Sequence, residues 1–141
     1  MPDILHELTI EATPDAVYAA ITEENGLKGW WTTHTKAQPA VGSVAEFGFM
    51  GGQMVFKMKI KTLEAGKTVN WDVEGGGPPD WAATRVTWDL TPVEGGTKVL
   101  FGHRGYASSE GSFASVNYNW GYFLTSLKAY VETGQGMPNT N

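Results

Sequence analysis

Near its C-terminus the chain changes its hydrophobic period, and this change constrains the fold more than any other feature of the sequence. Between residues 113 and 131 apolar side chains recur at steps of three and four residues, which predicts a helix of about twenty residues with one broad apolar face. Ser112 is placed to cap the start of this helix and Gly134 its end. No other predicted element has an apolar surface large enough to cover a sheet.

Most of the chain before that helix alternates between apolar and polar residues, as half-buried strands do. The first predicted strand spans residues 4–11 and places on its core face Ile4, His6, Leu8 and Ile10. Further strands are predicted at 44–49, 54–61, 68–74, 84–90 and from Thr97 onward. Two choices remain open for the inward face of the last strand, either Val99, Phe101 and His103 or Leu100, Gly102 and Arg104.

Two short helical segments are predicted between the first two strands. Thr13 can act as N-cap and Pro14 as first helical residue, and Asn25-Gly26 is expected to end this helix. Residues 27–31, which include the pair Trp30-Trp31, predict a second short helix or a turn. Glycine and proline predict a loop at 75–79.

Composition excludes several classes of protein. Of the 141 residues, 41% are apolar and 18% charged, which is typical of one globular domain. The absence of cysteine excludes disulfides, thiolate metal ligands and a cysteine nucleophile. The net charge of −5 argues against nucleic acid or an anionic membrane surface as the main partner. No apolar run is long enough to span a bilayer, and the N-terminus lacks the pattern of a secretory signal, so we expect a cytoplasmic protein.

Together these patterns predict an α+β fold. A curved antiparallel sheet of about six to seven strands is expected to wrap around the long C-terminal helix, with one or two short helices after the first strand. Residues 1–135 are expected to form a single domain and residues 136–141 a frayed C-terminal tail.

Three segments carry a resemblance to a known superfamily. They are I-E-A-T-P-D-A-V-Y-A-A-I-T at 10–22, Gly26-Leu27 followed by Trp30-Trp31-Thr32, and W-G-Y-F-L-T-S-L-K-A-Y-V-E-T-G at 120–134. On these residues the chain resembles the helix-grip fold of the START-like and birch-pollen-allergen superfamily. Within it, the chain is similar to the branch homologous to the C-terminal domain of the activator of the heat-shock protein 90 ATPase. The motifs mark capping and packing positions and bring no catalytic constellation with them.

The resemblance implies a hydrophobic pocket between the concave face of the sheet and the C-terminal helix. The residues expected to line it are Trp30, Trp31, Phe47, Phe49, Met54, Phe56, Met58, Trp71, Trp88, Phe101, His103, Trp120, Phe123 and Leu127. The same side chains can instead fill one another and make a solid core. Adaptable methionines and tryptophans with a polar tip favour the pocket.

Few polar residues are candidates for chemistry in this fold. An inward Arg104 would need Glu46 or a ligand acid as partner, and otherwise it faces solvent. We expect His6 to be an ordinary core or rim histidine and His34 to lie in a loop at the pocket mouth. Because His6, His34 and His103 lie on different elements without the short spacing of metal ligands, we expect no metal and no cofactor.

Motifs for catalysis are missing as well. The chain has no G-x-S-x-G, no H-E-x-x-H and no P-loop. Residues 108–112 are expected to form a loop and a helix cap. The acidic residues of the strands are expected on the outer face of the sheet, namely Glu7, Asp72, Glu74 and Asp89. We therefore assign no catalytic residue.

Three functions follow from these observations. The favoured one is binding of a small apolar or amphipathic molecule by a monomer or homodimer, with the Trp30-Trp31 segment and the 75–79 loop as a gate. The second is a chaperone-associated interaction domain, which the resemblance implies. The third is a cyclase- or hydrolase-like enzyme that uses His103 or Arg104, because enzymes acting on polyketide-like substrates occur among helix-grip proteins.

Overall fold

Seven strands form one sheet in the computed structural model, which describes residues 1–141. They are β1 (Ile4–Ile10), β2 (His34–Lys36), β3 (Val44–Phe49), β4 (Met54–Glu64), β5 (Thr68–Gly75), β6 (Arg85–Val93) and β7 (Gly96–Arg104). Their order is β1-β7-β6-β5-β4-β3-β2, and every neighbouring pair is antiparallel. Two register irregularities between β4 and β5 are β-bulges of the kind that bend a strand.

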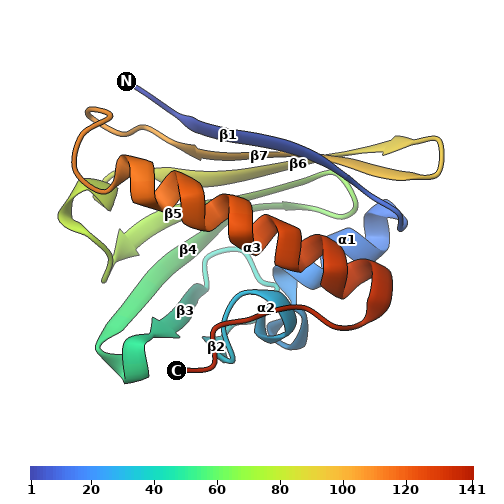
Figure 1. Ribbon diagram of the computed structural model, residues 1–141, viewed down its shortest axis with the longest axis horizontal. Coiled ribbons are helices and arrows are strands. Elements are labelled where there is room, and N and C mark those ends of the chain that lie inside the picture. The colour runs from blue at the N-terminus through green and yellow to red at the C-terminus, as the bar shows by residue number, and fades with distance from the viewer.

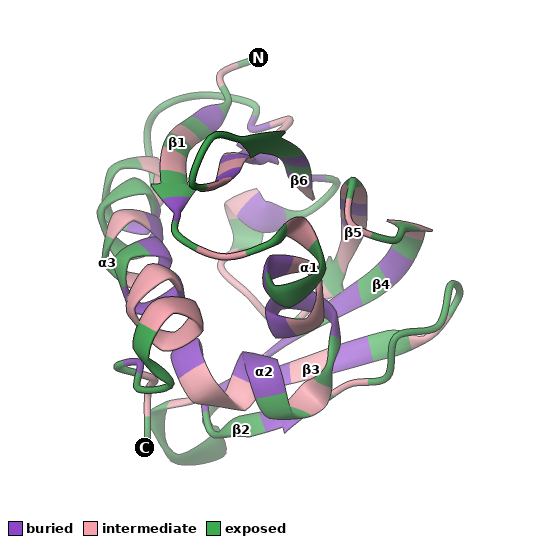
Figure 2. Ribbon diagram, turned by 90° about the vertical axis from the view of Figure 1, so that its right-hand side faces the viewer, coloured by how far each residue is buried: buried purple, intermediate pink, exposed green.

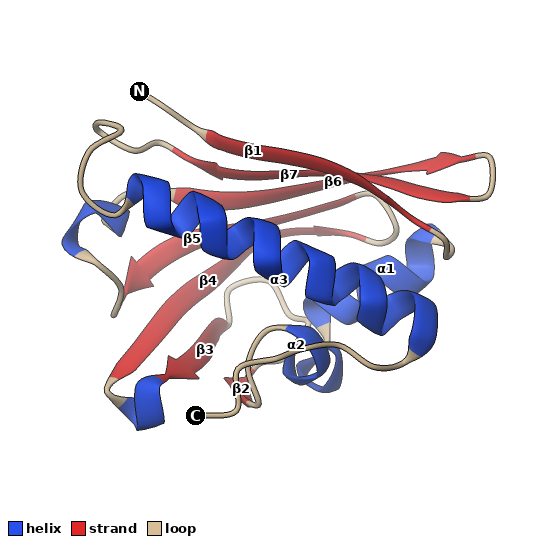
Figure 3. Ribbon diagram, in the orientation of Figure 1, coloured by secondary structure: helices blue, strands red, loops and turns tan.

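One long helix covers the sheet, as Figure 1 shows. This helix, α3 (Phe113–Thr133), runs across the face around which the sheet curves, while α1 (Pro14–Thr22) and α2 (Glu24–Trp30) lie near its C-terminal end (Figure 3). Two single-turn 3₁₀ helices, η1 (Met50–Gly52) and η2 (Pro79–Trp81), lie in loops between strands. The α+β helix-grip fold predicted from the sequence is confirmed.

The predicted inward faces of the strands are the buried ones. Buried and exposed residues alternate along β4, where the lysines face solvent (Figure 2). On β7 the open choice is settled, because the side chains of Val99, Phe101 and His103 are fully buried on the helix side. Arg104 points to the outer face, where it donates a hydrogen bond to Thr87 at 3.0 Å and pairs with Asp3 at 3.4 Å.

Three local predictions are wrong. Asn25-Gly26 does not end a helix: α1 ends at Thr22, and α2 runs through Gly26, where a Cβ would come within 2.6 Å of the Ala20 backbone. His34 lies in the edge strand β2 rather than in a loop. Ser112 makes no side-chain cap for α3, because its hydroxyl donates to Asp80 instead. The caps at Thr13 and Gly134 are as predicted.

The C-terminal residues, expected to fray, are held against the segment before β2. The amide of Asn139 donates to Trp31 O at 2.8 Å, and Thr33 N donates to Asn139 O at 2.9 Å. Met137 N donates to the Ser126 hydroxyl at 2.7 Å. These bonds tie the end of the chain to α3 and to the residues that follow α2. None of the helices has the length and hydrophobicity needed to cross a lipid bilayer.

Candidate functional site

Side chains fill the space at the centre of the concave face of the sheet. Trp31 stacks on Trp30 and on Trp71, with ring centroids 5.8 and 6.1 Å apart, and lies 4.2 Å from Phe47. Trp88 meets Trp71 edge to face at 5.7 Å. Eight of the residues expected to line a pocket are part of this filled core: Trp30, Phe47, Met58, Trp71, Trp88, Phe101, His103 and Leu127.

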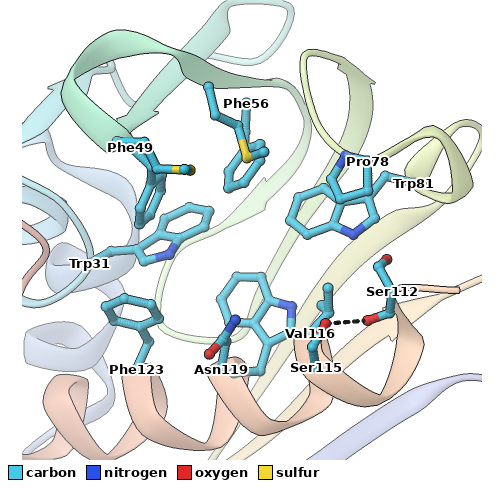
Figure 4. Close-up of a pocket in the computed structure, with 13 residues that line it drawn as sticks. Trp31, Phe49, Phe56, Pro78, Trp81, Ser112, Ser115, Val116, Asn119 and Phe123 are labelled. Atoms are coloured by element: carbon cyan, nitrogen blue, oxygen red, sulfur yellow. Dashed lines mark hydrogen bonds between the residues drawn. The ribbon is translucent and has the colours of Figure 1, made fainter.

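A pocket of about 340 Å³ lies beside the filled core, towards the N-terminal half of α3. Its walls are α3, the β3–β4 hairpin with η1, and the segment around η2 (Figure 4). Six residues expected from the sequence line it: Trp31, Phe49, Met54, Phe56, Trp120 and Phe123. Seven more were not expected there: Met50, Pro78, Trp81, Ser112, Ser115, Val116 and Asn119. Nine of the thirteen are hydrophobic, and none is an acidic, basic or histidine residue.

The helical wall carries two adjacent stripes. Val116, Trp120 and Phe123 follow the steps of four and three residues that keep side chains on one face of a helix. Beside them a polar stripe runs along the mouth, formed by Ser112, Ser115 and Asn119. The Ser115 hydroxyl donates to Ser112 O at 3.1 Å (Figure 4). Asn119 is exposed, and its side-chain amide group makes no hydrogen bond within the protein.

The hairpin wall is aromatic and ends in an unusual turn. The rings of Phe49 and Phe56 lie 5.2 Å apart, and Phe49 meets Phe123 of α3 edge to face at 6.1 Å. The turn then places Met50 at φ 55°, which is uncommon for a residue with a side chain, and Met50 is 61% exposed. A flexible apolar side chain therefore stands at the rim of the pocket.

The third wall depends on Trp81, which was not among the residues expected to line the pocket. Its ring lies 4.5 Å from Phe56 and is 4% exposed, while its Nε1 has no hydrogen-bond partner. Pro78 borders the pocket next to it, so the 75–79 loop does lie at the pocket edge. Of the pair predicted to act as a gate, Trp31 lines the pocket and Trp30 does not, and the two side chains are 2% and 0% exposed.

Behind the pocket, a buried histidine joins two of the walls. Trp120 Nε1 donates to Nδ1 of His103 at 3.1 Å. The Thr84 hydroxyl has one proton, which it donates to Trp81 O at 2.6 Å. In its 2.9 Å contact with His103 the hydroxyl oxygen is therefore the acceptor, and Nε2–H of His103 is the donor. Burial lowers the pKa of His103 to about 4, opposed by the charge of Asp80. His103 is therefore neutral at pH 7 and holds Trp120 and Thr84 in place.

Asp80 closes the N-terminal end of α3. Its two carboxylate oxygens accept hydrogen bonds from Ser112, one from the hydroxyl at 2.7 Å and one from the amide at 2.9 Å. These bonds hold the pKa of Asp80 below its usual value. Gly111 allows the close approach: its φ is +69°, and a Cβ there would lie 2.9 Å from Asp80 Oδ2.

Other polar candidates lie away from the pocket. His6 contacts Asn117 at 2.9 Å, and His34 contacts Thr140 O at 3.3 Å. No three histidine or acidic side chains cluster in a way that could hold a metal ion. Neither His103 nor Arg104, the residues considered for an enzyme, lines the pocket. The arrangement can therefore enclose an apolar molecule, but it presents no acid or base to it.

Several proteins of known structure are similar to this chain in fold. The Aha1 dimer from Colwellia psychrerythraea is 37% identical with a TM-score of 0.88, and the match covers 96% of this chain and 100% of that one. Protein SSP2350 from Staphylococcus saprophyticus is 17% identical with a TM-score of 0.81, over 99% and 98% of the two chains. The AHSA1-like protein from Aeromonas hydrophila is 19% identical with a TM-score of 0.74, over 94% of each chain. The last two show the fold alone.

No curated protein gives a sequence match. Residues 11–132 match the family described as activator of Hsp90 ATPase homolog 1-like protein. This match covers most of the chain, and the Colwellia structure agrees with it in both sequence and fold. The chain belongs to the family of activator of Hsp90 ATPase homolog 1-like proteins.

Proposed function

We propose that the protein binds a small hydrophobic or amphipathic molecule in the pocket between α3, the β3–β4 hairpin and η2. The observation that carries this proposal is an apolar space of about 340 Å³ beside an otherwise filled core. Pockets for small molecules typically measure about 300–1,000 Å³ and combine apolar walls with a few polar groups. The polar stripe at the mouth supplies such groups here.

The pocket walls suit an adaptable apolar site. Met50 and Met54 line it with unbranched side chains that adjust to the shape of a ligand. A ligand that hides about 200 Å² of apolar surface there would gain roughly 5 kcal/mol from leaving water. Because no titratable group lines the pocket, the proposal includes no chemical step.

Titration with the neutral dye Nile red tests the proposal. We expect saturable binding by the natural chain, seen as a rise and blue shift of dye fluorescence. Ser115→Trp places a large ring at the pocket mouth and should abolish binding. The matched control is Thr125→Trp, since Thr125 is also exposed on α3 but does not line the pocket. Equal binding by both variants would refute the pocket as the site.

A second function is favoured by the similarity to an Aha1 protein. The Colwellia relative carries that name, and it is a dimer. On this basis we propose, as the alternative, a chaperone-associated interaction role for this chain and a homodimer as its state. The test is the ATPase rate of a purified Hsp90-type chaperone with and without the protein. An unchanged rate, with no complex on a sizing column, would count against it. A cytoplasmic location stays a prediction.

A further inference from the structure

The walls of the pocket also restrict the charge of what it can hold. Thirteen residues line it and none is an acidic, basic or histidine residue, so an ionised ligand would find no counter-charge inside. Moving an unpaired charge out of water into an apolar space is costly. A ligand of this pocket is therefore favoured when it carries no charge.

The N-terminus of α3 begins at the pocket, where Ser112 is a lining residue, and a helix N-terminus can attract an anion. The first turn of a long helix such as α3 presents unpaired amides and a partial positive charge. In this protein Asp80 already occupies that position, because both its carboxylate oxygens accept hydrogen bonds from Ser112. Ser112 is itself a lining residue, so this carboxylate lies directly behind the pocket wall. An arriving anion would meet a negative charge instead of a positive one.

The shape of the lining adds a second restriction. Six of the thirteen lining residues have aromatic rings: Trp31, Phe49, Phe56, Trp81, Trp120 and Phe123. Aromatic rings prefer offset-stacked or edge-to-face contacts with other rings. Along the mouth, Asn119 offers an amide donor and acceptor that make no hydrogen bond within the protein. A ring system with one hydroxyl or carbonyl group can use both features.

Resting on the function proposed above, we propose that the pocket selects an uncharged aromatic molecule bearing a hydroxyl or carbonyl group, and that Asp80 is the residue that rejects anionic ligands. Asp80 does not line the pocket and so touches no ligand itself. It acts by its charge through Ser112, and so it sets specificity without contributing to the apolar contacts. A carboxylate of the same ring skeleton is the ligand that this arrangement excludes.

Two probes of one skeleton, 2-naphthol and 2-naphthoate, separate these ideas by isothermal titration calorimetry at pH 7. We expect 2-naphthol to bind about tenfold or more tightly than 2-naphthoate. In Asp80→Asn the affinity for 2-naphthoate should rise about three- to tenfold, while that for 2-naphthol stays within about twofold. Glu7→Gln removes a negative charge from the exposed outer face of β1 and should leave both affinities unchanged.

The possible results distinguish failure of the binding function from failure of the charge selectivity. If neither probe binds, the binding function itself fails, and the inference fails with it. If both probes bind equally, or 2-naphthoate binds better, the pocket stands and its charge selectivity is overturned. If Asp80→Asn folds and keeps the full preference, Asp80 is not the selective residue. Should that variant not fold, Asp80→Ser removes the same charge and takes its place. In the natural chain, whose net charge is −5, the affinity for 2-naphthoate must also rise between 20 and 500 mM salt, and the absence of a rise would overturn charge repulsion as the cause of the selectivity.

Discussion

Acid should destabilise this protein through one buried histidine, His103. Its pKa is lowered to about 4 by burial, whereas an unfolded chain has a histidine pKa of about 6.5. Between these values the unfolded chain binds a proton at His103 and the folded chain does not. Stability is therefore fully present above about pH 6.5, falls as the pH drops towards 4, and falls no further from this residue below that. The gap between the two pKa values corresponds to about 3 kcal/mol.

The assay is urea unfolding followed by circular dichroism at several pH values from 7.5 to 4. His103→Gln removes the titrating ring and keeps a donor and an acceptor for Thr84 and Trp120. We expect the natural chain to lose about 3 kcal/mol more stability over this range than the variant does. Carboxylates that do not interact with His103 titrate alike in both proteins, so their contribution cancels in the difference; Asp80 does interact with it and is counted with His103. His34→Gln, in the exposed edge strand, is the control for loss of one histidine. Parallel pH curves for the natural chain and His103→Gln would refute the reasoning.

Three further substitutions test the packing by the same unfolding assay. Leu127→Ala should cost about 2–5 kcal/mol, because this fully buried side chain fixes α3 on the sheet; a loss below about 1 kcal/mol would contradict that role. Trp88→Ala should cost at least about 3 kcal/mol, because its ring is 0% exposed and packs against Phe101 at 4.7 Å; a tolerated change would mean that Trp88 borders open space. Gly26→Ala should destabilise despite alanine's higher helix propensity, since its Cβ would lie 2.6 Å from the Ala20 backbone, and a stabilised variant would disprove that close contact.

The sheet and the long helix could be predicted because each has one buried face. Alternation along 54–61 and the helical spacing after residue 113 are direct consequences of that one-sided burial, and both are confirmed. Gly26 shows the limit of local patterns. Asn-Gly usually marks a helix end, but the contact between α1 and α2 needs a residue without a side chain at that point. The strand β2 has only three residues, which is too short for a period to be seen.

The position of the pocket could be predicted only in part. The alternating pattern identifies the inward side chains, yet whether they meet or leave a space depends on contacts between distant segments. Trp31 fills the centre of the concave face by stacking on Trp71, with its ring centroid 5.1 Å from that of Trp120. Local sequence patterns do not predict contacts between such distant residues. Trp81 carried a usable signal, since tryptophan side chains are highly buried on average and this one directly follows the loop residues Pro78-Pro79-Asp80.

Binding of a small molecule in the pocket is tested most directly by following the six tryptophan side chains by NMR. Indole N–H signals of the ¹⁵N-labelled protein are assigned by single substitutions and then recorded during titration with 2-naphthol. We expect the signals of the three lining tryptophans, Trp31, Trp81 and Trp120, to shift most and to saturate together, while those of the core tryptophans Trp30, Trp71 and Trp88 shift much less. Saturable binding that leaves Trp81 and Trp120 unshifted, or no shift of any indole signal at millimolar 2-naphthol, would contradict it.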